Sequence, residues 1–227
     1  MALLTIEHLS ASYEEEQVLR DVNLTLAQGE IVCILGQSGA GKTSLLKAIT
    51  GHKNLQILNG SILFDGMELT KMTAAKKREL MGVQIGMIPQ NPAASFNPLR
   101  SFYSQIKELY KSHGKTYDNA EAIHALSSIG LKDPERVLRS RPYEMSGGMN
   151  QRIAIAVAML LAPSLLICDE PTSALDRGNA ALVVEEILEL AGNHQTAVLM
   201  ITHDPRIAER IADRTAIMEE GTLKWNC

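Results

Sequence analysis

The 227-residue sequence has few aromatic side chains, few cysteines and no strong excess of either charge. Aromatic residues make up 4% of the chain, whereas single-strand nucleic-acid binders usually need several aromatic side chains on which bases stack. The net charge of −4 comes from interspersed acidic and basic residues, so there is no basic field that would attract nucleic acid. The sequence therefore predicts no nucleic-acid partner.

Long apolar runs and a leader sequence are also missing. The longest apolar run, residues 153–162, covers ten residues before Pro163, whereas a helix needs about twenty to cross a bilayer. We expect a chain that does not cross a membrane by itself and, without a basic, apolar and small-residue leader, is not secreted. Cys33, Cys168 and Cys227 show no paired spacing, and we expect small buried side chains in a reducing compartment.

Residues 31–44, I-V-C-I-L-G-Q-S-G-A-G-K-T-S, join an apolar strand to a glycine-rich loop that matches the phosphate-binding pattern G-x-x-x-x-G-K-[ST]. Backbone N–H groups must approach a polyphosphate closely, which explains glycine where the chain bends. Lys42 would supply a positive charge for the outer phosphates, Thr43 a hydroxyl for Mg²⁺, and the following helix the positive end of its dipole. The complete pattern favours this site over an ordinary glycine-rich turn. The expected nucleotide-contacting residues are Gly36, Gln37, Ser38, Gly39, Ala40, Gly41, Lys42, Thr43 and Ser44.

Two carboxylates follow the apolar run L-L-I-C of residues 165–168, which suits a central parallel strand covered on both faces. Mg²⁺ that bridges the outer phosphates needs a carboxylate opposite the threonine hydroxyl, and Asp169 fits that role. Glu170, which we expect to point elsewhere on the pleat, could act as the general base on an attacking water. An acidic strand-to-loop turn is the alternative, which the phosphate loop upstream disfavours.

Gln90 and His203 each close an apolar strand-like run. The carboxyl edge of an open α/β sheet is where ligands bind, so both side chains could reach the γ-phosphate, its metal or the attacking water. On spacing alone, a single glutamine or histidine at a strand end is more often an ordinary loop residue.

The segment Ser146-Gly147-Gly148 combines a capping hydroxyl, two glycines and a helix N-terminus, which together suit anion binding. One phosphate loop already accounts for one triphosphate. This second site therefore makes sense if it covers a nucleotide that is bound by another copy.

Strand-like and helix-like segments alternate, which predicts an α/β protein with a mainly parallel core sheet. Residues 4–30 predict an N-terminal antiparallel β group, and the helical pattern of residues 101–141 indicates an inserted helical lobe. We expect one domain over residues 1–227, with a helical subdomain over about 92–162 inserted in a P-loop NTPase core. The expected helices are 42–50, 71–80, 146–162, 178–191 and 207–211, the expected strands 31–35, 61–64, 85–89, 197–202 and 215–218, and the expected loop 51–59.

The ordered set G-Q-S-G-A-G-K-T, Gln90, M-S-G-G-M, L-L-I-C-D-E, S-A-L-D at residues 173–176 and His203 resembles the ATP-binding subunit of an ATP-binding-cassette (ABC) transporter. The resemblance covers essentially the whole chain. It implies an ATPase that uses ATP and Mg²⁺, with Lys42 and Thr43 on the phosphates and the metal. The other roles that it implies are Tyr13 stacked on adenine, Gln90 coupling the site to the transmembrane partner, Ser146 to Gly148 completing the opposing subunit's site, Glu170 as the base, Asp176 linking the two sites and His203 on the γ-phosphate.

The same resemblance implies partners and a location. These are membrane permease subunits, a second ATPase subunit that is identical or homologous, and indirectly a solute-binding protein, at the cytoplasmic face of the cell membrane. The phrases I-P-Q-N-P-A-A-S-F-N-P-L and M-S-G-G-M-N-Q-R are similar to those of importers of peptides, nickel and related metal chelates, and Met149 fits that branch. Peptide-type relatives usually continue beyond the position of Cys227, which favours nickel or a metal chelate as cargo and leaves a peptide as the alternative.

Two other functions are compatible with a phosphate loop. A non-transport ABC ATPase acting in a soluble complex usually shows paired cassettes, long coiled coils or basic extensions, none of which the sequence has. A P-loop kinase would leave the S-G-G segment and Asp176 without a role.

Overall fold

The computed structural model describes residues 2–173 and 175–226, so Ala174 of the S-A-L-D segment and the terminal Cys227 lie outside the described residues. Its central element is a six-stranded sheet with the strand order β10-β9-β3-β8-β7-β6. All neighbouring strands in it run parallel except β9 and β10. The strands are β3 (Ile31–Leu35), β6 (Ile85–Ile88), β7 (Leu165–Asp169), β8 (Ala197–Ile201), β9 (Arg214–Glu219) and β10 (Thr222–Trp225). This sheet confirms the predicted mainly parallel α/β core.

A second, antiparallel sheet has the order β2-β1-β4-β5 and confirms the predicted N-terminal β group. Its strands are β1 (Ala2–Tyr13), β2 (Glu16–Ala27), β4 (Gln56–Phe64) and β5 (Met67–Glu68). The prediction of a loop over residues 51–59 is wrong from Gln56 onward, because Gln56 and Ile57 pair with Ser12 and Ala11 of β1.

Gly60 explains this error. It has a φ of +88°, and a Cβ there would lie 2.4 Å from the carbonyl oxygens of Glu7 and His8 on β1. The register of β1 against β4 shifts between Glu7 and Ser10, so Gly60 faces a β-bulge inside a continuous strand. A glycine that resembles a strand boundary in the sequence is therefore a point of close backbone approach.

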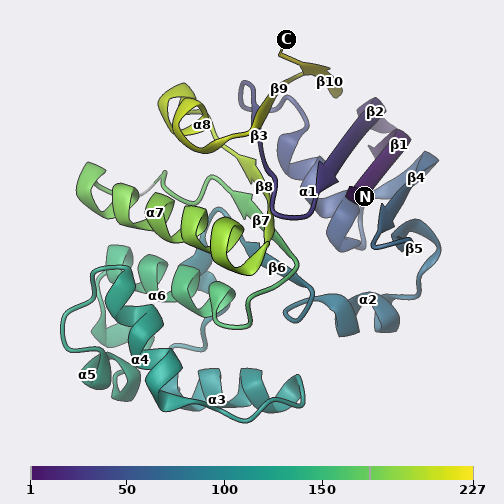
Figure 1. Ribbon diagram of the computed structural model, residues 1–227. Helices are drawn as coiled ribbons and strands as arrows, with labels where there is room; N and C mark the ends of the chain where they lie inside the picture. The colour runs from purple at the N-terminus through teal and green to yellow at the C-terminus, as the bar shows by residue number, and fades with distance from the viewer. Residues whose placement is uncertain (1, 174, 227) are drawn as a thin grey trace.

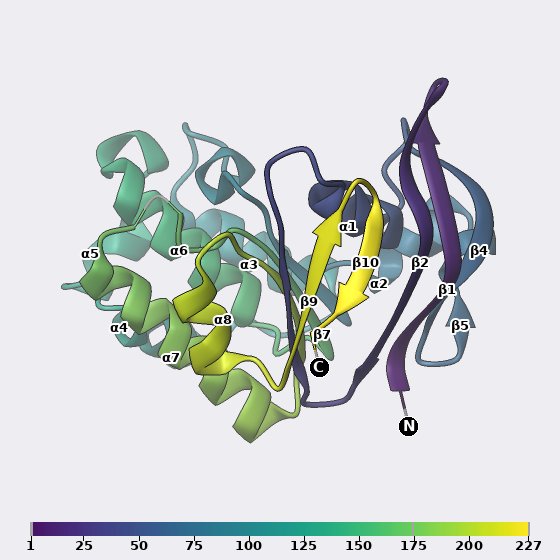
Figure 2. The ribbon, with the colours of Figure 1, turned by 90° about the horizontal axis from the view of Figure 1, so that it is seen from above.

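The helices cover the core sheet on both faces. Figures 1 and 2 show α1 between the core sheet and the antiparallel sheet, α6, α7 and α8 on the opposite face, and α3, α4 and α5 beyond α6. The helices are α1 (Lys42–Thr50), α2 (Ala74–Leu80), α3 (Phe102–Ser112), α4 (Asn119–Ser128), α5 (Pro134–Arg139), α6 (Gly147–Met159), α7 (Arg177–His194) and α8 (Pro205–Ile211). Short 3₁₀ turns are η1 (Leu69–Lys71), η2 (Pro92–Ser95) and η3 (Pro142–Glu144).

Several helix bounds differ from the prediction. The helix α2 starts at Ala74, because Thr73 caps it by accepting a hydrogen bond from the N–H of Lys76. The helix α6 ends at Met159, ahead of the predicted stop at Pro163, and α7 continues to His194 beyond the predicted end at residue 191. Helix ends depend on capping groups that periodicity alone does not reveal.

Three buried apolar clusters hold the layers together. One lies between the antiparallel sheet, α1 and the core sheet, one joins the other face of the core sheet to α6, α7 and α8, and one fills the helical region around α3 to α6. The strand β3 contributes Val32 and Ile34 to the first cluster and Ile31 and Cys33 to the second, as expected for a parallel strand covered on both faces.

Cys33 and Cys168 are fully buried, as predicted. Burial raises the pKa of the Cys33 thiol to about 12 and raises the pKa of Cys168 as well, so both remain thiols at neutral pH. In the described part of the chain, no helix is long and apolar enough to cross a membrane.

Candidate nucleotide-binding and hydrolysis site

The phosphate loop between β3 and α1 is shaped by two neighbouring strands. A Cβ on Gly36, whose φ is +153°, would lie 2.4 Å from the backbone oxygen of Met218 in β9. A Cβ on Gly41, whose φ is +103°, would lie 2.7 Å from the backbone oxygen of Val18 in β2. Gly39 has a φ of +83° and meets nothing within 4 Å, so only its backbone conformation calls for glycine there.

Lys42 lies inside this loop. Its side chain is 6% exposed, and Nζ donates hydrogen bonds to the carbonyl oxygens of Gly36 and Gln37 over 2.7 and 2.8 Å. The side of the loop formed by Gln37, Ser38 and Gly39 is exposed. The loop therefore presents open backbone around a fixed positive charge, which suits a bound polyphosphate.

The fold brings Thr43, at the start of α1, to Asp169, at the end of β7. The Thr43 hydroxyl donates to the Asp169 carboxylate, with distances of 3.1 and 3.4 Å to its two oxygens. Burial raises the pKa of Asp169, and the Thr43 hydrogen bond and the positive charge of Lys42 act in the opposite direction. A hydroxyl and a carboxylate oxygen side by side are the hard ligands that Mg²⁺ prefers, so this pair fits the predicted metal position.

Glu170 and His203 also lie together. Nδ1 of His203 is 3.2 Å from Oε2 of Glu170, and their side chains are 64% and 20% exposed, respectively. Glu170 contacts a different partner from Asp169, in line with the expectation that the two side chains point apart. The cause is not the pleat, because the strand ends at Asp169 and Glu170 adopts a left-handed φ of +50°. Its N–H donates to the carbonyl of Ile201 in β8 over 2.9 Å. The backbone turn therefore directs this carboxylate, at a strain cost of about 1–2 kcal/mol.

Gln90 is exposed just beyond β6, the edge strand that pairs with β7. The ends of parallel strands meet at one sheet edge, so Gln90 lies at the same carboxyl edge as Asp169, Glu170 and His203. The structure thus gathers the phosphate loop and all four predicted strand-end residues along one edge of the core sheet.

Tyr13 closes β1 and is half-buried. With Glu14, Glu15, Glu16 and Asn54 it lines an open depression of about 630 Å³. Nζ of Lys47 lies 5.6 Å from the centre of the Tyr13 ring, within cation–π range. Lys47 is a neighbour of this site that the sequence reasoning missed, although it lies in the helix that follows the phosphate loop.

Ser146, Gly147 and Gly148 begin α6, and the Ser146 Oγ accepts a hydrogen bond from the N–H of Met149 over 3.3 Å, which confirms the predicted N-cap. A Cβ on Gly147 or on Gly148 would meet nothing within 4 Å. The packing of this chain therefore does not require either glycine. The fold also separates this segment from the phosphate loop, because α6 and α1 pack on opposite faces of the core sheet (Figure 1).

Asp176 has a local role that sequence reasoning missed. It caps α7 by accepting hydrogen bonds from the N–H groups of Gly178 and Asn179, both over 3.0 Å. Hydrogen bonds from the backbone and side chain of Asn179 lower the pKa of its carboxyl. The sequence contains a signal for this capping role, because aspartate directly before a helical pattern is a favoured N-cap.

Comparisons with known proteins agree with this arrangement. A family model described as ABC transporter matches residues 19–173. The chain is 34% identical over 98% of its length to the metal-staphylopine import system ATP-binding protein CntD of Staphylococcus aureus, and covers 84% of that protein. It is 37% identical over 92% of its length to the oligopeptide transport ATP-binding protein OppD of Lactococcus lactis, and spans 63% of that protein, which is less than two thirds.

Two solved structures share the fold. One is a dimeric ATP-binding cassette in a post-hydrolysis state bound to ADP and Pi, with a TM-score of 0.86 and 24% identity, covering 97% of this chain and 96% of that chain. The other is an ATP-binding subunit of an ABC transporter, with a TM-score of 0.82 and 29% identity, covering 97% of this chain and 88% of that chain.

Proposed function

The chain belongs to the ABC transporter family and is an ATPase, and from this premise we propose that it powers an importer of metal chelates or peptides. Both relatives reported above are the ATP-binding proteins of import systems. One of them is named for a metal–staphylopine cargo and the other for oligopeptides, so the proposal includes both cargo classes. Neither relative supports a non-transport role in a soluble complex.

The observation that carries the proposal is the convergence of the phosphate loop, the Thr43–Asp169 pair and the Glu170–His203 pair at one sheet edge. The triphosphate of ATP would lie against the loop, where Lys42 offsets its charge. Thr43 and Asp169 would hold Mg²⁺, with Gln90 beside them, and the bound metal neutralises charge on the outer phosphates.

Glu170 is the proposed general base. It takes a proton from the attacking water as the water oxygen bonds to the γ-phosphorus, and the bond from that phosphorus to the bridging oxygen breaks to leave ADP. His203 orients this carboxylate through the 3.2 Å contact. Its ring would also contact the γ-phosphate. Tyr13 would stack against the adenine ring.

A second subunit would complete the site. The N–H groups at the start of α6 are accessible, because Ser146 is exposed and a Cβ on Gly147 or Gly148 would meet nothing. They cannot contact a phosphate bound to this chain's own loop, because α6 packs on the opposite face of the core sheet from α1. We infer that they close over the ATP of a facing ATPase subunit, identical or homologous, and that Asp176 links the two sites.

The contact with the permease would come from the helical subdomain over about 92–162. A cavity of about 450 Å³ lies between β6, α3 and α6, lined by apolar side chains that include Met87, Phe96, Leu109 and Val157. At its rim, the loop before α3 carries Leu99, whose side chain is 75% exposed. Binding to a permease there would place the chain at the cytoplasmic face of the membrane, and any solute-binding protein would act through the permease.

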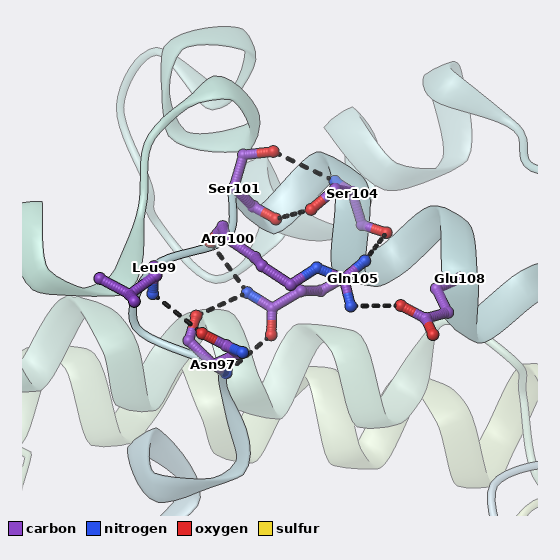
Figure 3. Close-up of polar contacts among 7 residues, drawn as sticks. All are labelled: Asn97, Leu99, Arg100, Ser101, Ser104, Gln105 and Glu108. Atoms are coloured by element: carbon purple, nitrogen blue, oxygen red, sulfur yellow. Dashed lines mark hydrogen bonds and ion pairs between the residues drawn. The ribbon is translucent and has the colours of Figure 1, made fainter.

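The loop that carries Leu99 is held in one shape (Figure 3). The Gln105 Oε1 accepts from the N–H of Asn97 over 2.8 Å, and its Nε2 donates to the carbonyls of Asn97 and Arg100 over 3.1 and 3.0 Å. The Asn97 Oδ1 accepts from the N–H of Leu99, and Arg100 pairs with Glu108. A fixed loop with an exposed apolar side chain suits a protein contact, because little conformational entropy is lost on binding.

Pull-down of the tagged chain from detergent-solubilised membranes tests the proposal. We expect co-purification of a polytopic permease together with the second ATPase subunit. Recovery of soluble partners alone would contradict the importer and favour the non-transport alternative.

A further inference from the structure

Three successive side chains near the start of α6 bind three different backbone segments. Asn150 donates from Nδ2 to the carbonyl of Pro142 over 2.8 Å, Gln151 from Nε2 to that of Pro171 over 3.1 Å, and Arg152 from Nη1 to those of Ile129 and Gly130 over 3.2 Å. They form the N-Q-R of the M-S-G-G-M-N-Q-R phrase, for which the proposed hydrolysis steps have no role.

Gln151 differs from its two neighbours because its hydrogen-bond acceptor lies next to Glu170. Its side chain is 4% exposed, and its acceptor, Pro171, is itself buried and directly follows Glu170. The N–H and hydroxyl of Ser173 bind back to the carbonyl of Glu170 over 3.2 and 3.0 Å. Gln151 therefore ties the helix that begins at Gly147 to the tight turn that carries Glu170.

We infer that Gln151 is a positioning residue that transmits closure at one ATP site to the general base of the other. This inference rests on the proposed two-subunit site. There, the S-G-G segment of a chain contacts ATP held by the facing subunit, whereas Glu170 acts on ATP held by its own phosphate loop. Gln151 joins these two elements within one chain through a single buried hydrogen bond.

Because the hydrogen bond between Gln151 and Pro171 is buried, the two residues should move together. A buried carbonyl that loses its donor is costly, so Pro171 follows when Gln151 moves with α6. The start of α6 also has hydrogen bonds left to gain, because Oδ1 of Asn150 and Nε of Arg152 are buried with no hydrogen-bond partner among the described residues. A shift of this part of α6 that satisfied those atoms would move Gln151 and, through Pro171, the backbone next to Glu170.

The test compares Gln151→Leu with Thr196→Val in the full chain. Thr196 is a matched control, because it is also buried and donates from its hydroxyl to a proline carbonyl, that of Pro163, over 2.8 Å, at the opposite end of β8. Both variants lose one buried hydrogen bond of the same kind. Only Gln151→Leu removes the link to Glu170.

The first readout is the Hill coefficient of ATP hydrolysis. With two coupled sites it can approach about 2, and we expect it to fall to about 1 in Gln151→Leu and to stay at the wild-type value in Thr196→Val. The second readout is amide exchange in the peptide that contains Ser173, which ATP should slow in the wild type and in Thr196→Val, and not in Gln151→Leu. Gln151→Met repeats the test if Gln151→Leu does not give a soluble protein.

The outcomes separate this inference from the proposed function. A cooperative wild type whose Hill coefficient is unchanged in Gln151→Leu overturns the inference and leaves the two-subunit site standing. Equal loss of cooperativity in Thr196→Val would show a general effect of destabilisation and would also overturn it. A wild type with a Hill coefficient of about 1 would also overturn the inference, because there is then no coupling for Gln151 to transmit, whereas only a rate per subunit that is independent of dimer formation would overturn the two-subunit site.

Discussion

Nδ1 of His203 lies 3.2 Å from a carboxylate oxygen of Glu170, at the ends of the neighbouring parallel strands β8 and β7. The contact depends on the left-handed backbone of Glu170, which turns the side chain toward the next strand as soon as β7 ends. A carboxylate held in this way is oriented before substrate binds, as a general base should be.

Glu170→Gln should therefore keep ATP binding and stop turnover. The amide fills the same space but cannot accept the proton of water, so we expect hydrolysis to fall by about 10²- to 10⁴-fold. Steady-state phosphate release and equilibrium nucleotide binding measure the two effects, and the ATP-bound variant should persist as a closed dimer. Glu68→Gln, which alters an ion pair between the end of β5 and Lys71 of η1, is the matched control. Parental turnover in Glu170→Gln would refute the assignment of the base.

Gly36 and Gly39 should differ in what they contribute to stability. Gly36→Ala places a Cβ against the Met218 carbonyl as well as straining the loop, so we expect a loss of at least about 3 kcal/mol of unfolding free energy. Gly39→Ala adds only backbone strain, about 1–2 kcal/mol, because nothing lies near its Cβ. Urea unfolding of both variants gives the comparison. Equal losses would show that close approach of β9 is not what requires glycine at Gly36.

Asp169→Asn should stabilise the nucleotide-free protein. Burial raises the pKa of Asp169 in the folded state, so its ionisation opposes folding and stability is lost as pH rises through the folded pKa. The neutral amide should raise Tm at pH 7, and this advantage should vanish below about pH 4, where Asp169 is protonated in the folded and the unfolded state. Scanning calorimetry over pH checks the sign. A lower Tm of Asp169→Asn at pH 7 would contradict this prediction. Nucleotide binding by the same variant should no longer depend on Mg²⁺, because the metal loses its carboxylate ligand.

Leu99→Ala should uncouple transport from hydrolysis. Leu99 is exposed on a loop held by Gln105, so its loss should lower transport per ATP severalfold and leave the ATPase rate of the isolated chain within about 2-fold. Vesicle uptake and phosphate release measure the ratio. An equal decrease in both activities would assign Leu99 to packing.

Phe96 is a less suitable probe of the permease contact than Leu99. Phe96 lies three residues before Leu99 and lines the cavity of the helical subdomain, so it is the obvious second candidate for the permease contact. In the structure, the Phe96 ring packs edge-on against Phe102, with ring centres 5.0 Å apart, and joins the helical cluster. Phe96→Ala should therefore also reduce stability, which makes it a poor probe of coupling.

Features set by neighbouring residues in the chain were predictable. The path from β3 through the glycine loop to α1 matches the expected bounds, because strand, loop and helix signals lie next to one another. Ser146 is the N-cap that its position before a helical pattern indicates. Asp169 and Glu170 could be placed at the sheet edge, because a short apolar run ending in carboxylates is typical of a central parallel strand.

Features set by distant segments were not predictable. The close approach of Met218 to Gly36, and the bulge opposite Gly60, depend on strands far away in the sequence. The bond from Gln151 to Pro171 joins a helix to a loop across a buried interface, and nothing in the local pattern marks either partner. Spacing identifies candidate residues, whereas their contacts come from the packed layers.

We propose that the loop around Lys42 forms half of a site, which Ser146, Gly147 and Gly148 of a facing subunit would complete. The most direct test is the rate of phosphate release per subunit as the protein is diluted at saturating ATP, with subunit association followed by light scattering. We predict that ATP binding persists on dilution while the rate per subunit falls in step with dissociation. A rate per subunit that stays constant as the dimer dissociates would contradict the account.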